Sequence, residues 1–200
     1  MLIVIEGIDG AGITTHTKLL ANWLSSKGYR VVLTKEPTQN PIGAIIRRYL
    51  NMDVPPQVDA LLFAADRVEH AYSVVGPALE KGFIVLCDRY LESSLAYQSA
   101  EGLDLDWLLN INRYAPKPDL TIILDVDPSI SLRRKRLIKP EKFENESFLR
   151  IVRANFLKRA ASCGYPVVNT NRLVEEVQQE LRGIVTTFLK SRMLEGLKAL

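Results

Sequence analysis

The chain has 200 residues, of which 47% are hydrophobic and 24% charged, and its formal net charge is only +3. This composition excludes an intrinsically disordered chain and a coiled coil, and it predicts one globular domain with a sizeable core over residues 1–200. The small charge gives no support to nucleic-acid binding. No apolar stretch approaches the ~20 residues that cross a bilayer, so we expect neither nucleic acid nor a membrane as a partner.

The two cysteines, Cys87 and Cys163, lack the spacing of a metal site or of a disulfide framework. Reduced thiols of this kind predict a cytoplasmic location. The chain begins directly with an apolar run, without the basic segment or the cleavage site of a signal peptide. We therefore expect no targeting segment at this end.

Short apolar runs predict five strands, at residues 2–5, 31–34, 83–87, 120–126 and 165–168. Each run is nearly all apolar rather than alternating, which is typical of strands buried on both faces of a parallel sheet. Helical patterns lie between them, at about 14–26, 58–80, after Tyr90, after Asp104, after Asp127, from 146 and from 173. The second pattern would bend near Gly76-Pro77, because proline removes a helical donor. The alternation predicts an α/β fold, a three-layer sandwich around a parallel sheet of about five strands.

A glycine-rich segment, residues 7–15, follows the first predicted strand. Gly7, Gly12 and Thr14 fit the phosphate-loop pattern G-x-x-x-x-G-K-[ST], but position 13 is isoleucine instead of lysine. The glycines let backbone N–H groups approach phosphate oxygens at a helix N-terminus, and Thr14 would place its hydroxyl on Mg²⁺. Ile13 cannot supply the lysine's charge. We predict that ATP is bound by Gly7, Asp9, Gly10, Ala11, Gly12, Ile13, Thr14 and Thr15; an ordinary glycine-rich turn is the alternative.

Polar segments also follow the second and third predicted strands, where ligands of such sheets bind. Asp88 ends the third strand and would hold a Mg²⁺ water, while Arg89 would bridge the donor and acceptor phosphates with its planar fork. The alternative for this pair is a surface ion pair. Phe63 and Arg67 are four residues apart and share a helix face, so the ring would stack on a pyrimidine and the guanidinium would reach a base carbonyl. Their alternative is a core phenylalanine and a solvated arginine.

In this order and at strand ends, four segments together resemble the thymidylate kinase family over about residues 2–170. They are Thr34-Lys35-Glu36-Pro37-Thr38, Leu61-Leu62-Phe63-Ala64-Ala65-Asp66-Arg67, Asp88 to Gln98, and Pro116-Lys117-Pro118-Asp119-Leu120. The third is the most specific, because it is similar to that family's signature D-R-[YFH]-x-x-S-S-x-A-Y-Q. Archaeal and bacterial members look closer than eukaryotic ones. The resemblance implies the topology of P-loop NTPases, ATP and dTMP as substrates, Mg²⁺ as cofactor and a homodimer.

The resemblance also implies roles for single residues. Asp9 would lie near the acceptor's 3′ hydroxyl, Lys35 would contact its phosphate, and Phe63 and Arg67 would hold the thymine ring and its O4. Tyr97 and Gln98 would limit the sugar at its 2′ carbon and contact the base. A turn aspartate, a solvated lysine and ordinary helix packing are the structural alternatives. The predicted substrate-binding residues are Asp9, Lys35, Glu36, Phe63, Arg67, Arg89, Ser94, Tyr97 and Gln98, and the predicted metal ligands are Thr14 and Asp88.

A basic cluster between the fourth strand and the helix from about 146 consists of Arg133, Arg134, Arg136, Lys139 and Lys142. The resemblance implies a mobile lid here, at about 133–145, that closes over ATP. Positions 8–11 carry no basic residue, so the lid would supply the charge that stabilises the transferred phosphate. We predict Arg134 and Arg136, with Arg89 and Asp88, as the catalytic residues. A solvated cationic face is the alternative.

The leading functional hypothesis is phosphoryl transfer from ATP to dTMP, giving dTDP and ADP. A second hypothesis is a nucleotide-binding relative with little or no kinase activity, because Ile13 removes a preorganised charge. A third keeps the reaction but changes the acceptor to another pyrimidine monophosphate such as dUMP or UMP. Tyr97 argues against ribonucleotides if it packs where the 2′ hydroxyl would lie.

Overall fold

The structure is a computed structural model, and it describes residues 1–50, 52–135 and 145–198. Its centre is a five-stranded parallel sheet in the order β2-β3-β1-β4-β5. The strands are β1 (Leu2–Gly7), β2 (Val31–Lys35), β3 (Ile84–Asp88), β4 (Leu120–Asp125) and β5 (Val167–Asn169). All five predicted strands and the predicted α/β sandwich are therefore confirmed.

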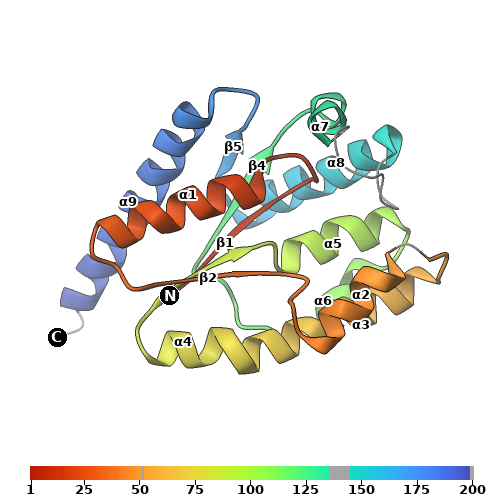
Figure 1. The fold of residues 1–200 in the computed structure, drawn as a ribbon, viewed down its shortest axis with the longest axis horizontal. Coiled ribbons are helices and arrows are strands. Elements are labelled where there is room, and N and C mark those ends of the chain that lie inside the picture. The colour runs from red at the N-terminus through yellow and green to blue at the C-terminus, as the bar shows by residue number, and fades with distance from the viewer. Residues whose placement is uncertain (51, 136–144, 199–200) are drawn as a thin grey trace.

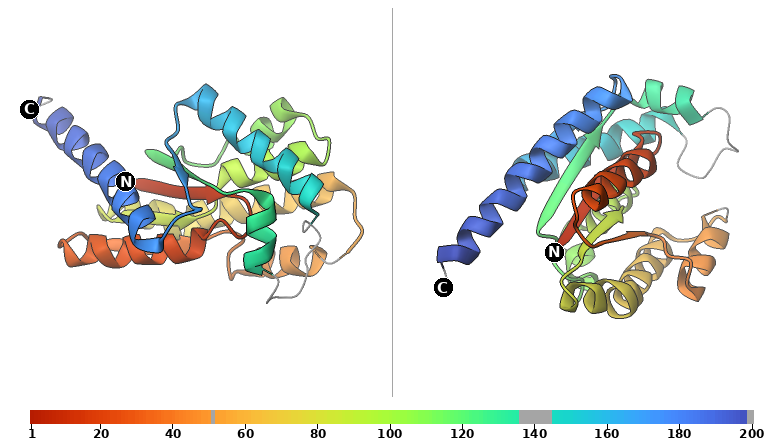
Figure 2. Two further views of the ribbon diagram at one scale, coloured as in Figure 1. Left: turned by 90° about the horizontal axis from the view of Figure 1, so that it is seen from above. Right: turned by 60° about the vertical axis from the view of Figure 1, so that its left-hand side comes forward.

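Helices cover both faces of this sheet (Figures 1 and 2). In chain order they are α1 (Ile13–Ser26), α2 (Pro41–Tyr49), α3 (Pro56–His70), the π-helical turn η1 (Ala71–Val75), α4 (Gly76–Glu80), α5 (Leu91–Ala100), α6 (Leu105–Ile111), α7 (Pro128–Lys135), α8 (Glu146–Cys163) and α9 (Val174–Lys198). The side chains of the central strand β1 pack against the helices on both faces of the sheet. Its Ile3 and Ile5 belong to the main core with α1 and α9, whereas Leu2 and Val4 pack in a second cluster with η1 and α4. Among the described helices none is both long and apolar enough to cross a membrane.

The edge strands differ from the prediction that every strand is buried on both faces. The central strands β1 and β3 are fully buried, but Leu33 of β2 is 44% exposed and Val167 of β5 is partly exposed as well. The reason is position, because an edge strand has a neighbouring strand on one side alone and less helical cover. An apolar run therefore predicted the strand but not its place in the sheet.

The capping and proline signals in the sequence predicted one helix start and one helix bend, but they were not used to predict α2. Asp104 caps α6 by accepting a hydrogen bond from the Trp107 backbone N–H at 2.8 Å. The bend expected at Gly76-Pro77 is a π-helical turn just before that pair, where the Gly76 N–H donates to the Ala71 carbonyl. Helix α2 was not predicted, although Asn40-Pro41 at its start is a typical N-terminal signal.

The sheet brings the predicted site residues to one edge. Parallel pairing aligns Lys35 of β2 with Asp88 of β3, and Ile5 of β1 with the same aspartate. The loop after β1 therefore emerges beside the segment after β3, at the carboxyl ends of adjacent strands.

Candidate active site

The loop between β1 and α1 is seated tightly against β4 and α7. A Cβ on Gly7 would lie 2.4 Å from the Leu124 carbonyl oxygen, and one on Gly10 would lie 2.7 Å from the Ser131 carbonyl oxygen. Gly10 also has a φ of 75°, and the Ser131 hydroxyl donates to the Asp9 carbonyl. Both glycines are thus required by close backbone approach. Gly7 is a glycine position of the phosphate-loop pattern, whereas Gly10 is not.

Ile13 does not face the loop. Its side chain is only 5% exposed and belongs to the main hydrophobic core, while the neighbouring Thr14 and Thr15 are exposed at the start of α1. The residue that replaces the usual lysine therefore packs inward. The loop keeps its glycines and the helix N-terminus for phosphate, but its position 13 supplies no charge.

Thr14 and Asp88 meet at the carboxyl ends of the central strands. The Thr14 hydroxyl donates to Asp88 Oδ2 at 2.5 Å, and Asp88 is 3% exposed. The Nζ atom of Lys35 lies 3.9 Å from the same Oδ2 atom. A hydroxyl and a carboxylate are oxygen ligands that suit Mg²⁺, which takes one or two protein carboxylates plus substrate phosphates. The described residues contain no group of three or more His, Cys, Asp or Glu side chains able to hold a metal ion by themselves.

Arg89 is held in a strained conformation beside the loop. Its φ of 68° lies in the left-handed region, which is rare for a non-glycine residue and typical of functional positions. The guanidinium donates to the Gly7 carbonyl at 2.9 Å, to the Ser93 hydroxyl at 3.0 Å and to Asp9 Oδ1 at 2.5 Å. Burial works against its charge, but the carboxylate of Asp9 raises the pKa of Arg89 above its ordinary value. Arg89 is thus a permanently charged fork between the loop and α5.

Glu6 supports this conformation and was missed by the sequence analysis. Its carboxylate accepts the Tyr90 backbone N–H at 2.9 Å and the Ser93 hydroxyl at 2.5 Å. Burial raises the pKa of Glu6 to about 7, although the Ser93 hydrogen bond and the charge of Arg89 work in the opposite direction. A single glutamate within an apolar strand carries no local signal of this role.

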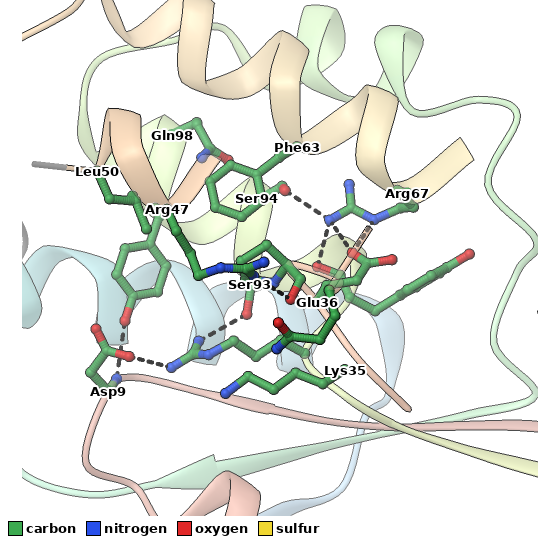
Figure 3. A pocket seen from close by; sticks show the side chains of 15 residues that line it. Asp9, Lys35, Glu36, Arg47, Leu50, Phe63, Arg67, Ser93, Ser94 and Gln98 are labelled. Carbon is green, nitrogen blue, oxygen red and sulfur yellow. Dashed lines mark hydrogen bonds and ion pairs between the residues drawn. The ribbon is translucent and has the colours of Figure 1, made fainter. Parts of the chain in front are cut away.

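A cavity of about 290 Å³ lies between the ends of β2 and β3 and the helices α3 and α5 (Figure 3). It brings together all nine residues that were predicted to bind the acceptor, although what they bind stays a prediction. Six further lining residues were not predicted; they are Pro37, Gln39, Arg47, Leu50, Tyr90 and Ser93. Arg47 was missed because α2, which carries it, was missed.

Arg67 lies at the end of the cavity away from the loop and is only 1% exposed. Its Nε donates to Glu36 Oε2 at 2.9 Å, and its terminal nitrogens donate to Asn112, to the Tyr90 carbonyl and to the Ser94 hydroxyl. The second oxygen of Glu36 lies 2.9 Å from His70 Nδ1. The alternative of a solvated arginine is therefore wrong, and Phe63 beside it lines the cavity rather than the core.

Tyr97 and Gln98 form another wall. The Tyr97 hydroxyl accepts the Asp9 backbone N–H at 3.0 Å, and its ring packs edge-on to Phe156 at 6.3 Å between centroids. Gln98 is 2% exposed, and its Oε1 atom has no hydrogen-bond partner within the described part of the chain. A buried acceptor without a donor is costly in a folded protein, so an oxygen at a cavity wall is suited to a ligand N–H.

The predicted lid is described only at its start. Arg134 of α7 donates to the Thr170 carbonyl at 2.8 Å and to the Gly10 carbonyl at 3.4 Å, so it reaches the loop from the side opposite the cavity. Arg133 is exposed and donates to the Ser129 carbonyl. Arg136, Lys139 and Lys142 lie outside the described residues. The catalytic role of Arg134 and Arg136 stays a prediction.

Comparisons with known proteins agree with this geometry. The model of the thymidylate kinase family matches residues 5–181. A probable thymidylate kinase of Thermococcus gammatolerans is 44% identical over 200 residues, which cover 92% of this chain and 95% of that protein. Probable thymidylate kinases of Pyrococcus horikoshii and Pyrobaculum aerophilum are 45% and 47% identical, each over 92% of this chain and over 94% and 95% of their own. The chain that folds into this loop and cavity belongs to the thymidylate kinase family.

Proposed function

We propose that the protein transfers a phosphoryl group from ATP to dTMP, giving dTDP and ADP. The observation that carries this proposal is the polarity of the cavity in Figure 3. Lys35 and Arg89 lie toward the phosphate loop, while Phe63, Ser94 and Gln98 lie toward the opposite end. A nucleoside monophosphate has the same polarity, with a charged phosphate at one end and an uncharged base at the other.

The uncharged end suits a pyrimidine base. Arg67 is neutralised by Glu36, and its hydrogen bonds to the described residues leave one N–H, on Nη1, that would meet a base carbonyl without net charge beside the ring. The buried Gln98 Oε1 would accept a ring N–H, and Phe63 would stack on the ring face. Tyr97 lines the cavity, and it would favour a deoxyribose over a ribose if its ring packs where the 2′ hydroxyl would lie.

The charged end suits transfer between two phosphates. Arg89 would neutralise charge that develops between donor and acceptor, and the glycine-rich loop would hold the ATP phosphates by its N–H groups. Thr14 and Asp88 would hold Mg²⁺, which when bound shields the phosphate charges. An acceptor phosphate is already a nucleophile, so no strong general base is needed. Catalysis by this chain would then be mostly positioning and electrostatic stabilisation.

The direct test measures ADP production from ATP and Mg²⁺ with dTMP, dUMP, UMP and dCMP in turn, for the native chain and for Ile13→Lys. We expect the native chain to turn over, with dTMP giving the highest kcat/KM. Measurable dTMP binding without turnover of any acceptor would contradict the proposal. Turnover only after lysine is restored would support the alternative of a nucleotide-binding relative that Ile13 disables. A higher kcat/KM for another monophosphate would mean that this monophosphate, and not dTMP, is the preferred acceptor.

We also propose that the protein acts as a cytoplasmic homodimer. Leu61 and Val68 of α3 and Tyr72 of η1 are exposed, and their spacing places them on one helix face. Burying such a face against a second copy would remove it from water. Sedimentation of the native chain should give the mass of a dimer, and Leu61→Glu should shift it toward the monomer. A native chain that sediments as a monomer would contradict this proposal.

A further inference from the structure

A cluster of polar side chains joins the end of β2 to α3 behind the wall of the cavity. Thr34 and Glu36 are two residues apart, so they share one side of the extended chain. Arg67 and His70 are three residues apart and share one face of α3. Glu36, Arg67 and His70 are each at most 2% exposed. His70 is not among the described residues that line the cavity, and the proposed function gives it no role.

Both ring nitrogens of His70 are bonded. Nδ1 lies 2.9 Å from Glu36 Oε1, and Nε2 lies 2.6 Å from the Thr34 hydroxyl oxygen. A carboxylate oxygen only accepts, so Nδ1 carries the hydrogen of the first bond. The Thr34 hydroxyl can donate or accept, so it suits the other nitrogen. The imidazole is therefore held in one orientation between the strand and the carboxylate.

The second oxygen of Glu36 orients Arg67 (Figure 3). Oε2 accepts from Arg67 Nε at 2.9 Å and lies 2.8 Å from Nη2. Nη2 also donates to the Tyr90 carbonyl and to the Ser94 hydroxyl, and Nη1 donates to Asn112. One N–H of Nη1 then remains without a partner among the residues that the structure describes. Because the guanidinium is planar, its contact with Glu36 sets the direction of this last N–H.

We propose that His70 is a positioning residue for base recognition, which holds Glu36 so that Arg67 directs its remaining N–H at a carbonyl of the acceptor base. The inference rests on the proposed function, in which Arg67 meets that carbonyl. A thymine has the acceptor O4 at this edge, whereas a cytosine has an amino group, which donates. His70 thus contributes to the choice of dTMP over dCMP without touching the base.

The test compares two substitutions of His70 that each keep one of its contacts. The amide nitrogen of asparagine is bonded to Cγ, as Nδ1 is, so His70→Asn keeps a donor for Glu36 and loses the contact with Thr34. The amide nitrogen of glutamine lies one carbon further out, as Nε2 does, so His70→Gln keeps the contact with Thr34 and loses the donor. Asparagine is the smaller side chain and leaves the larger void. Packing alone therefore predicts more harm from His70→Asn, and the proposal predicts more from His70→Gln.

Each chain is assayed for kcat and KM with dTMP and with dCMP, and its affinities for both and for Mg²⁺-ADP are measured by calorimetry. We expect the ratio of kcat/KM for dTMP to that for dCMP to fall about tenfold in His70→Gln, the scale of one weakened hydrogen bond to a charged group. In His70→Asn it should stay within about threefold. The loss should lie in the KM for dTMP, with kcat and Mg²⁺-ADP affinity nearly unchanged. Ser73→Ala, at an exposed position in η1, is the control and should match the native chain.

An equal fall of the ratio in both variants would overturn the proposal, as would a larger fall in His70→Asn or no fall in His70→Gln. Thermal melts show whether each variant folds. If His70→Gln does not fold, His70→Leu replaces it as the variant without a donor. If His70→Asn does not fold, the ratio in His70→Gln decides alone.

The same measurements separate this inference from the proposed function. A native chain without turnover of either monophosphate would contradict the proposed function, and the calorimetric affinities for dTMP and dCMP would then judge His70. A native chain that turns over dTMP in preference, with the ratio unchanged in His70→Gln, would overturn the role of His70 alone. A native chain that prefers dCMP, or that binds neither monophosphate, would overturn both.

Discussion

At the acceptor cavity the polar side chains that would meet a base are buried and bonded to one another, whereas at the phosphate loop the side chains that would meet ATP stand at the surface. Glu36, Arg67 and His70 are all within 2% of full burial. Thr14 and Thr15, in contrast, are exposed. The side chains of the acceptor cavity are therefore held in place by contacts within the folded protein. We expect those at the phosphate loop to gain their contacts only when ATP binds. Substitutions in the acceptor cavity should change stability and those at the phosphate loop should change rate.

The strongest test of this contrast is Arg67→Met. It leaves the carboxylate of Glu36 buried without its guanidinium, and the loss of one partner of a buried pair costs about 3–5 kcal/mol. Urea unfolding should show this decrease in the free energy of unfolding, together with a lower affinity for dTMP. Arg113→Met, at an exposed arginine after α6, should change stability by no more than about 0.5 kcal/mol. Equal effects at the two positions would refute the contrast.

Glu6 tests the contrast through pH. Burial raises its pKa to about 7 from an ordinary value of 4.5, so between these values the folded chain binds more protons than the unfolded chain. The stability from neutral Glu6 is complete below pH 4.5 and is lost as pH rises through about 7. The difference corresponds to on the order of 3 kcal/mol.

We expect Glu6→Gln, which stays neutral, to gain stability relative to the native chain as the pH is raised from 5 to 8, measured by urea unfolding at both values. The charges that face this carboxylate, Arg89 and Glu92, remain in both chains. Glu175→Gln, exposed at the start of α9, is the matched control and should follow the native chain at both pH values. A pH-independent difference between Glu6→Gln and the native chain would show that Glu6 is ionised throughout this range.

On the donor side, Thr14→Ala should behave in the opposite way to Arg67→Met. Loss of the hydroxyl beside Asp88 should lower kcat about 10²-fold, or about 2.7 kcal/mol, because under the proposed function this hydroxyl would hold the metal ion of the phosphates. The free energy of unfolding should fall by no more than about 1 kcal/mol. Thr14→Ser keeps the hydroxyl and should retain most of the rate. A large loss of stability with an unchanged rate would place Thr14 with the structural residues.

The smallest effect is expected from Phe63→Ala, at the partly exposed wall of the cavity. Loss of a stacked ring should raise the KM for dTMP about tenfold, since base–aromatic stacking contributes about 1–3 kcal/mol. The KM for ATP should be unchanged, and Phe63→Tyr, which keeps a ring, should stay close to the native value. An increase in both KM values would mean that Phe63 maintains the fold of the site rather than the base contact.

Local patterns in the sequence were sufficient for much of this molecule. The five apolar runs predicted the strands, and the glycine spacing predicted the loop after β1. The residues expected to hold the acceptor, which all line one cavity, came mostly from the resemblance of short segments to the thymidylate kinase family. These features depend on residues that are close together in the chain or on segments that end at the same edge of the sheet. Signals of this kind need no knowledge of packing.

Only the tertiary structure decided which partner each side chain meets. The pairing of Arg67 with Glu36, the support of Tyr90 by Glu6, and the approach of Lys35 to Asp88 join segments that are 31, 84 and 53 positions apart in the chain. The direction of the Ile13 side chain, toward the hydrophobic core or toward the phosphate loop, also depends on the strands and helices that pack against it. Burial and charge neutralisation depend on such long-range contacts. For that reason the sequence predicted where the site lies, and the fold determined which side chains meet there.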